Sequence, residues 1–260
     1  MEHLIQHFRK DEQTFIEKVI GWQREVEDRF APKLTDFLDP RERFIVTSIV
    51  GQNNELSVQS FGGFDDAERQ RLYICPNYFQ PLENDFEISF FAVNYPSRFV
   101  QLKHPDVLGA LLSLGIGRSK FGDIRIEGDV IQFAVAKEVQ DYVYVNLNSI
   151  GKSKVKLEQI NFNQLVKIEE EWFDNTYTVS SMRLDVIIAT VLNFSRQKSQ
   201  SLIKAGKVKV NWTVREDTSF EVQEGDILSV RGFGRLKVMM SEGRTKKDKI
   251  RLQIGRLEKK

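Results

Sequence analysis

Hydrophobic positions recur at helical spacing near the start of the chain. One apolar stripe consists of Phe15, Val19, Trp22, Val26 and Phe30. Spacings of three and four residues place such side chains on one face of a helix, and Pro32 limits its continuation. Asp39-Pro40 is typical of a helix start, so a second helix is predicted over 40–50, ending at Gly51.

Strand-like and helix-like patterns then alternate. Short runs rich in aromatic and β-branched residues predict strands over 55–60, 71–75, 86–93, 123–127, 130–135 and 154–157. Apolar patterns predict helices over 107–114 and 138–150. Between residues 76 and 160 the resulting order is β-α-β-β-α-β, the arrangement of a ferredoxin-like domain.

RNA-recognition modules share this topology and stack bases on rings of their central strands. Phe90, Phe91 and Phe133 lie on predicted strands and are candidates for such a platform. A hydrophobic core accounts for the same three rings, and this second interpretation is favoured.

The last eighty residues begin with two short helical patterns, the first over 183–191. Ser195 is expected to cap the second helix, which runs to Ala205 and stops at Gly206. Strands are expected over 207–210 and 227–230, and a final strand follows from the alternation of Ile250, Leu252 and Ile254.

These patterns predict an α+β protein. The expected parts are an N-terminal α+β domain over 1–75, a ferredoxin-like (RRM-like) domain over 76–160, a linker over 161–180 and a C-terminal domain over 181–260. The linker is expected because it contains the acidic run Glu169-Glu170-Glu171.

Charge is distributed unevenly along the chain, although the formal net charge is only +1. Residues 181–260 hold 18 Lys and Arg against 9 Asp and Glu, a net charge of +9. The remaining residues hold 20 basic and 28 acidic side chains, a net charge of −8. Such asymmetry favours an anionic partner such as nucleic acid for the basic part, although a solvated basic tail would show the same counts.

Basic side chains of this part are predicted to form one continuous electropositive face. On the second helix Lys204 is expected to point outward, with Arg196 and Lys198 on the flanks. The free amides at the start of that helix also suit phosphate oxygens. Around two glycines, at 232 and 234, the sequence places Arg231, Arg235 and Lys237.

The run from Ser181 to Lys237 resembles an S4 domain, a small RNA-binding fold. The matching phrases are R-L-D at 183–185, S-R at 195–196 and L-I-K-A-G-K-V-K-V-N at 202–211. The whole chain is similar to the YlmH family of bacterial S4-domain proteins. Phrases that support this similarity are F-G-G-F-D-D-A-E-R at 61–69, H-P-D-V-L-G-A-L-L-S-L-G-I-G-R at 104–118 and G-D-I at 122–124.

The resemblance implies a protein that binds the large ribosomal subunit by docking on structured rRNA and tRNA. It further implies a role in quality control of stalled nascent chains, with peptidyl-tRNA as a partner, and an association with cell division. Ribosomal or cell-division proteins are further implied partners. By the same resemblance Arg183 is the leading RNA contact. The full set of predicted RNA-binding residues is Arg183, Arg196, Lys198, Lys204, Lys207, Lys209, Arg231, Arg235 and Lys237.

The four arginines of this set also have structural interpretations. Arg183 would instead pair with a nearby acid such as Asp185 or one in the linker, and Asp185 itself is expected to be structural because an acid facing RNA would repel it. Arg196 would support the first turn of its helix. Arg231 and Arg235 would be ordinary solvated charges of a strand.

Catalysis finds little support in the sequence. Of the three histidines, His3, His7 and His104, only the last lies in a folded pattern, where it is expected to cap a helix. The chain has one cysteine, and no metal-ligand cluster, nucleophile elbow or Walker pattern is present, so no cofactor or metal is expected. Without a long apolar run or signal-peptide pattern, a cytoplasmic protein with no membrane partner is predicted.

The alternatives are a pseudouridine synthase, since such enzymes often carry an S4 domain, and a cell-division adaptor that binds protein. A pseudouridine synthase requires a catalytic aspartate in a sizeable domain, usually after the S4 unit, and only 22 residues follow Val238. The favoured prediction is a non-catalytic, ribosome-associated RNA-binding protein.

Overall fold

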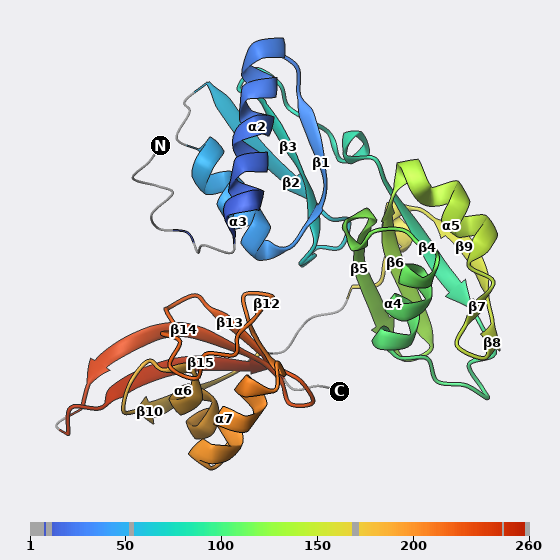
Figure 1. The fold of residues 1–260 in the computed structure, drawn as a ribbon. Helices are drawn as coiled ribbons and strands as arrows, with labels where there is room; N and C mark the ends of the chain where they lie inside the picture. Colours follow the sequence, from blue (N-terminus) through green and yellow to red (C-terminus); the bar gives the residue numbers. More distant parts are fainter. Residues whose placement is uncertain (1–7, 9–11, 52–54, 168–171, 246, 258–260) are drawn as a thin grey trace. The chain divides into compact units, whose positions relative to one another are not determined.

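The structure is a computed structural model that describes residues 8, 12–51, 55–167, 172–245 and 247–257. Helices and antiparallel sheets are mixed along the chain, which confirms the α+β class. The chain divides into two compact units, Met1–Ile168 and Glu169–Lys260 (Figure 1). Among the described residues no helix has both the length and the apolar character needed to cross a bilayer.

In the residues that the structure describes, the first part of the N-terminal unit consists of a three-stranded antiparallel sheet and two helices. Its elements are α2 (Gln13–Arg29), β1 (Lys33–Leu38), α3 (Pro40–Val50), β2 (Leu56–Phe61) and β3 (Gln70–Pro76), with strand order β1-β3-β2. The predicted helical stripe is buried at Val19 and Val26. Phe30 does not belong to it: this residue follows the helix with a left-handed backbone (φ 49°) and is 74% exposed.

Helix α3 begins as predicted at Asp39-Pro40. The Asp39 carboxylate accepts a hydrogen bond from the Glu42 N–H at 2.9 Å, and the Glu42 carboxylate accepts one from the Asp39 N–H at 2.8 Å. This reciprocal capping box satisfies two amides that a helix start leaves free. Strand β1, between the two helices, is missing from the predictions because its sequence, KLTDFL, lacks regular alternation.

The second part of this unit has ferredoxin-like topology, as predicted. Its principal elements are β4 (Ile88–Asn94), α4 (His104–Ser113), β5 (Phe121–Glu127), β6 (Val130–Ala136), α5 (Gln140–Asn146) and β9 (Lys156–Ile160). The strand order is β5-β6-β4-β9, and all three pairings are antiparallel. The first and third strands of the motif, β4 and β6, are therefore central, as in RNA-recognition modules.

Two local predictions for this part are wrong. The helix predicted over 138–150 ends at Asn146, and a small hairpin of β7 (Ser149–Ile150) and β8 (Ser153–Lys154) follows. β-branched residues have low helix propensity, and Gly151 supplies the turn with a positive φ of 58°. His104 is the first residue of α4 and not its cap: Asp106 instead accepts a hydrogen bond from the Lys103 N–H at 2.9 Å.

Both faces of the ferredoxin-like sheet are covered. Phe91 and Phe133 are almost fully buried in a core with α4 and α5. On the opposite face Phe90 is only 6% exposed and packs with Phe37 and Phe64 of the preceding segment. The three phenylalanines are therefore core residues. The face on which an RNA-recognition module stacks bases is occupied in this chain by its own N-terminal segment.

The phrase F-G-G-F-D-D-A-E-R contributes to the contact between these two parts. Asp123 of β5 accepts hydrogen bonds from the Glu68 N–H at 2.8 Å and the Arg69 N–H at 3.1 Å. Arg125 of β5 pairs with Asp66 at 2.6 Å. Burial raises the pKa of Asp123, and the charges of Arg125 and the neighbouring arginines oppose that rise. The phrases at 61–69 and 122–124 thus have a structural role in joining the two sheets.

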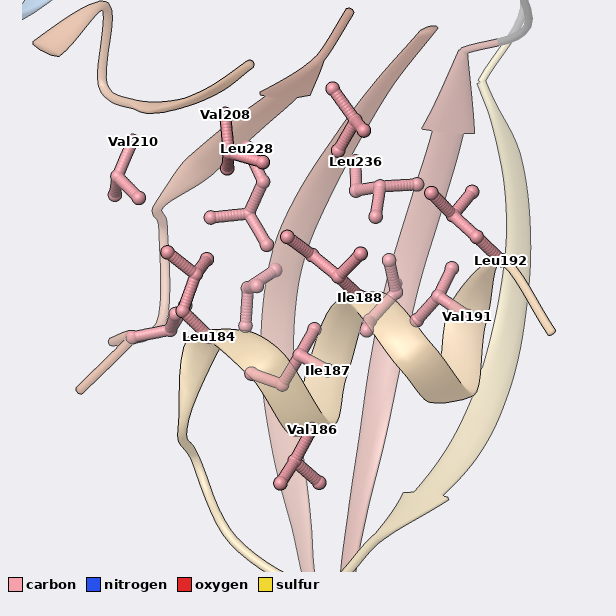
Figure 2. Close-up of a cluster of buried hydrophobic side chains, with 14 of the residues drawn as sticks. Leu184, Val186, Ile187, Ile188, Val191, Leu192, Val208, Val210, Leu228 and Leu236 are labelled. Carbon is pink, nitrogen blue, oxygen red and sulfur yellow. The ribbon is translucent and has the colours of Figure 1, made fainter. Parts of the chain in front are cut away.

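The described residues of the C-terminal unit form a six-stranded antiparallel sheet and two helices. Its elements are β10 (Phe173–Val179), α6 (Leu184–Val191), α7 (Arg196–Lys204), β11 (Val208–Val210), β12 (Thr213–Val214), β13 (Ile227–Val230), β14 (Gly234–Arg244) and β15 (Ile250–Leu257). The strand order is β10-β15-β14-β13-β11-β12. Figure 2 shows α6 against the strands, with Ile188 directed toward Leu228 and Leu236 in the shared core.

Strand β10 lies within the segment predicted as a linker, over 161–180. It pairs with β15 along its whole length, from Phe173↔Arg256 to Val179↔Ile250. Its sequence, FDNTYTV, buries only Val179, so the hydrophobic pattern of a strand is weak. The acidic run Glu169-Glu170-Glu171, on which the linker prediction depended, lies outside the described residues.

Candidate nucleic-acid interface

Helices α6 and α7, with Arg183 just before α6, form the helical layer of the C-terminal unit. At its centre lies the side chain of Asp185, which is fully buried in the first turn of α6. Its carboxylate accepts hydrogen bonds from Arg183 Nε at 3.0 Å and Arg183 Nη2 at 3.1 Å. It also accepts one from Arg196 Nε at 3.2 Å and one from Gln200 Nε2 at 2.8 Å. One carboxylate therefore holds polar side chains from the starts of both helices.

Local structure explains why these groups meet. Arg183 is the N-cap residue of α6, and Ser195 caps α7 by accepting a hydrogen bond from the Lys198 N–H. The buried Ser199 hydroxyl donates to the Asp185 backbone carbonyl at 2.6 Å, which fixes the two helix starts beside each other. The predicted caps and helix bounds agree with this geometry to within one residue.

The charge state of Asp185 follows from its partners. Burial raises the pKa of this carboxyl, but hydrogen bonds from Arg183, Gln200 and Arg196 outweigh burial and lower the pKa to about 2. The hydrogen bond to Asp185 in turn raises the pKa of Arg183. The carboxylate is thus ionised at neutral pH, and the guanidinium group of Arg183 stays charged.

The paired arginines still face solvent. The Arg183 side chain is 38% exposed and the Arg196 side chain 59% exposed. Asp185 engages the Nε of both groups and only one terminal nitrogen, that of Arg183. The structural interpretations of Arg183 and Asp185 are therefore correct, and they leave room for RNA contacts because an anchored guanidinium can present its other N–H groups to a phosphate.

The sequence patterns did not indicate an aromatic pair that lies beside α7. The rings of Phe194 and Phe233 meet edge to face with centroids 4.9 Å apart. Lys198 Nζ lies 3.7 Å from the Phe194 centroid and 5.5 Å from the Phe233 centroid. This cation–π contact joins the start of α7 to the turn between β13 and β14. The only available signals were the aromatic letters in F-S-R and G-F-G.

The same turn positions further basic residues. The Arg231 N–H donates to the Lys207 carbonyl at 2.9 Å, which places these two exposed residues at one end of the sheet. Gly232 and Gly234 have φ values of 90° and 95°, a conformation that glycine adopts without strain. Lys204 is exposed in the last turn of α7.

Three predicted residues lie on the opposite face of the sheet. Lys209 on β11 alternates with the buried Val208 and Val210. Arg235 and Lys237 on β14 alternate in the same way with the buried Leu236 and Val238. Because successive side chains of a strand point to opposite faces, these three point away from α6 and α7. The expectation of one continuous basic face is therefore wrong.

The structure therefore separates the predicted residues. The helices α6 and α7 and the residue that precedes α6 carry Arg183, Arg196, Lys198 and Lys204, whereas Lys207 and Arg231 lie next to each other just outside β11 and β13. The helix-free face of the sheet carries Lys209, Arg235 and Lys237. Within the described part of the chain, no group of three or more His, Cys, Asp or Glu side chains could hold a metal ion.

Three family models match successive stretches of this chain. The family model described as "YlmH, N-terminal" matches residues 11–79, "Putative RNA-binding domain in YlmH" matches 81–164, and the S4 domain matches 182–228. A relative from Bacillus subtilis (strain 168), named "Ribosome-associated protein quality control protein P2", is 45% identical over 258 residues. The match covers 98% of this chain and 99% of that relative.

A solved structure is also similar. It is titled "Cell division protein ylmH from Streptococcus pneumoniae", with 33% sequence identity and a TM-score of 0.54. The match covers 62% of this chain and 98% of the solved one. Fold and matches together define an S4-domain RNA-binding protein. More narrowly, the chain belongs to the YlmH family.

Proposed function

We propose that this protein docks on structured rRNA and tRNA of the large ribosomal subunit through the helical layer of its S4 domain. Its role there is to support quality control of stalled nascent chains, with peptidyl-tRNA as a partner. The protein is cytoplasmic and acts by binding, without catalysing a reaction of its own.

The observation that carries the proposal is the buried Asp185 with its two half-exposed arginines. A guanidinium held at one edge loses little further side-chain entropy when its free edge meets a phosphate. Lys198 and Lys204 on α7 extend the same layer with exposed charges. The name of the Bacillus subtilis relative supports the ribosomal setting.

Sedimentation with ribosomes tests this proposal. The double substitution Arg183→Ala and Arg196→Ala is expected to remove the protein from the large-subunit fraction. A matched control is Arg29→Ala, which removes an exposed, ion-paired arginine from α2 of the other unit. Co-sedimentation that survives the double substitution would argue for docking through protein contacts, as in the cell-division adaptor alternative.

The enzyme alternative has its own test. Purified protein is incubated with ribosomal RNA, and the RNA is digested and analysed by mass spectrometry for pseudouridine. We expect the pseudouridine content to stay at its starting value. An increase that depends on the protein would overturn the non-catalytic role.

A further inference from the structure

The C-terminal sheet has a face that the two helices of the described unit leave uncovered. Helices α6 and α7 share a core with the inward residues of β11, β13, β14 and β15, so both lie on the other face (Figure 1). The strand register aligns Lys209, Ser229 and Arg235 in one row across β11, β13 and β14. The next row contains Lys237 and, across β15, Gly255 and Asp174.

This face carries more positive than negative charge. Lys209 and Lys237 are exposed and form no ion pair with a residue that the structure describes. Among the residues named in these two rows, Asp174 is the acidic one. Arg235 is partly buried, and this burial lowers its pKa. Further along β15, Arg251 pairs with Glu242 at 3.2 Å.

An aromatic ring lies on the same face. A Cβ atom built on Gly255 would lie 3.2 Å from the indole of Trp172 and 3.5 Å from the Met239 sulfur. Leu252 and Ile254 of β15 point into the core shared with α6 and α7. Successive residues of a strand point to opposite faces, so the Cβ direction of Gly255, itself a buried residue, points to the helix-free face. The indole of Trp172 is only partly buried there, and it lies beside the row that contains Lys237.

We propose that this helix-free face binds an extended single strand of RNA, with Lys209, Arg235 and Lys237 on its phosphates and Trp172 stacked on a base. Open sheets that combine basic side chains with an aromatic ring suit single strands, because unpaired bases expose their flat faces. The inference rests on the proposed RNA-binding function. The inference places the single-stranded RNA on a surface that is separate from the helical layer.

Fluorine NMR of the full chain labelled with 5-fluorotryptophan tests the stacking contact directly. The chain has three tryptophans, and Trp172→Phe assigns the resonance of Trp172. The probe is oligouridylate of about ten nucleotides, within the usual site size of sheet-based binders. We expect the Trp172 resonance to shift as the oligonucleotide saturates, while that of Trp22 stays in place.

Substitutions on the two faces separate this inference from the proposed function. Lys209→Gln with Lys237→Gln is expected to weaken oligouridylate binding about tenfold, and to reduce the salt slope by about 1.4 for two lost phosphate contacts. Arg183→Ala with Arg196→Ala should leave oligouridylate binding intact.

Two outcomes would overturn the inference. One is an unmoved Trp172 resonance at saturation, and the other is unchanged affinity after the two lysine substitutions. If ribosome binding through Arg183 and Arg196 nevertheless persists, only this inference fails. If the wild-type protein binds neither ribosomes nor oligouridylate, the proposed function fails with it.

Discussion

Arg183 donates two hydrogen bonds to the carboxylate of Asp185, at 3.0 and 3.1 Å, although one residue alone separates them in the chain. The contact depends on the helix boundary between them, since Arg183 has an extended backbone and Asp185 lies in the first turn of α6. A carboxylate near a helix N-terminus also interacts favourably with the helix dipole. Asp185 thus stabilises the helix start and fixes the orientation of a candidate RNA contact.

Asp185→Asn tests this double role. The amide keeps the size of the side chain but has one acceptor atom and no charge, so Arg183 and Arg196 lose most of their anchor. We expect the free energy of unfolding to fall by about 2 kcal/mol, because charge-assisted hydrogen bonds are lost while the arginines remain solvated. Urea denaturation measures this loss. Ribosome binding should weaken as well, although Asp185 itself carries the wrong charge to touch RNA.

The stability of the C-terminal unit should depend on pH in the acid range. The pKa of Asp185 is lowered from 3.8 to about 2 in the folded chain, so unfolding takes up a proton between those values. The stabilisation is fully present above about pH 4. It is lost as the pH falls through the folded pKa, a change of about 2 kcal/mol.

Urea titrations of the wild type and Asp185→Asn between pH 2 and pH 7 would measure this dependence. The stability difference between the two proteins is expected to be constant near neutral pH and to shrink toward zero near pH 2. A difference that stays constant throughout would contradict the lowered pKa.

Arg196→Ala should weaken binding to structured RNA by about 1–2 kcal/mol, as for the loss of a charge-assisted hydrogen bond. The slope of log K against log salt should become shallower by about 0.9, because one phosphate contact is lost. Arg244→Ala is a suitable control, since Arg244 is an exposed residue that pairs with Asp248 outside the helical layer. An unaltered salt slope for Arg196→Ala would count against direct phosphate contact.

Local patterns predicted much of the fold. Asp39-Pro40 and Ser195 gave correct helix starts, because caps act through neighbours three residues away. The positions of Lys209 and Lys237 relative to α7 could not be predicted in the same way. Which face of a sheet a side chain occupies depends on register and on helix packing, and both are set by contacts distant in sequence.

Long-range contacts also explain the other omissions. The pairing of Phe194 with Phe233 spans 39 positions and leaves no periodic signal. Phe37 and Phe64 pack against Phe90 and bury it. Both belong to a segment that its own sequence pattern predicted to be a separate domain. Strand β10 is stabilised by pairing with β15 rather than by apolar side chains, so its sequence resembles a loop.

Gly63→Ala should destabilise the N-terminal unit. Gly63 has a φ of 89°, and a Cβ atom there would lie 2.2 Å from the Phe90 ring, so both backbone strain and steric overlap oppose the substitution. We expect a loss of at least about 2 kcal/mol in the free energy of unfolding. Displacement of the Phe90 ring would disrupt the packing of the N-terminal segment on the ferredoxin-like sheet. Thermal unfolding followed by circular dichroism measures the loss of stability.

Gly21→Ala is the matched control for that experiment. Gly21 lies inside α2, and a Cβ atom added there would meet no neighbouring atom within 4 Å outside the backbone of its own helix. The same added methyl group should therefore stabilise the unit by about 0.5–1 kcal/mol through higher helix propensity. Opposite signs for the two substitutions would show that the phrase F-G-G-F requires glycine at position 63 because of its conformation and its contact with Phe90. Equal effects would indicate that the contact between the two sheets adapts to the extra atom.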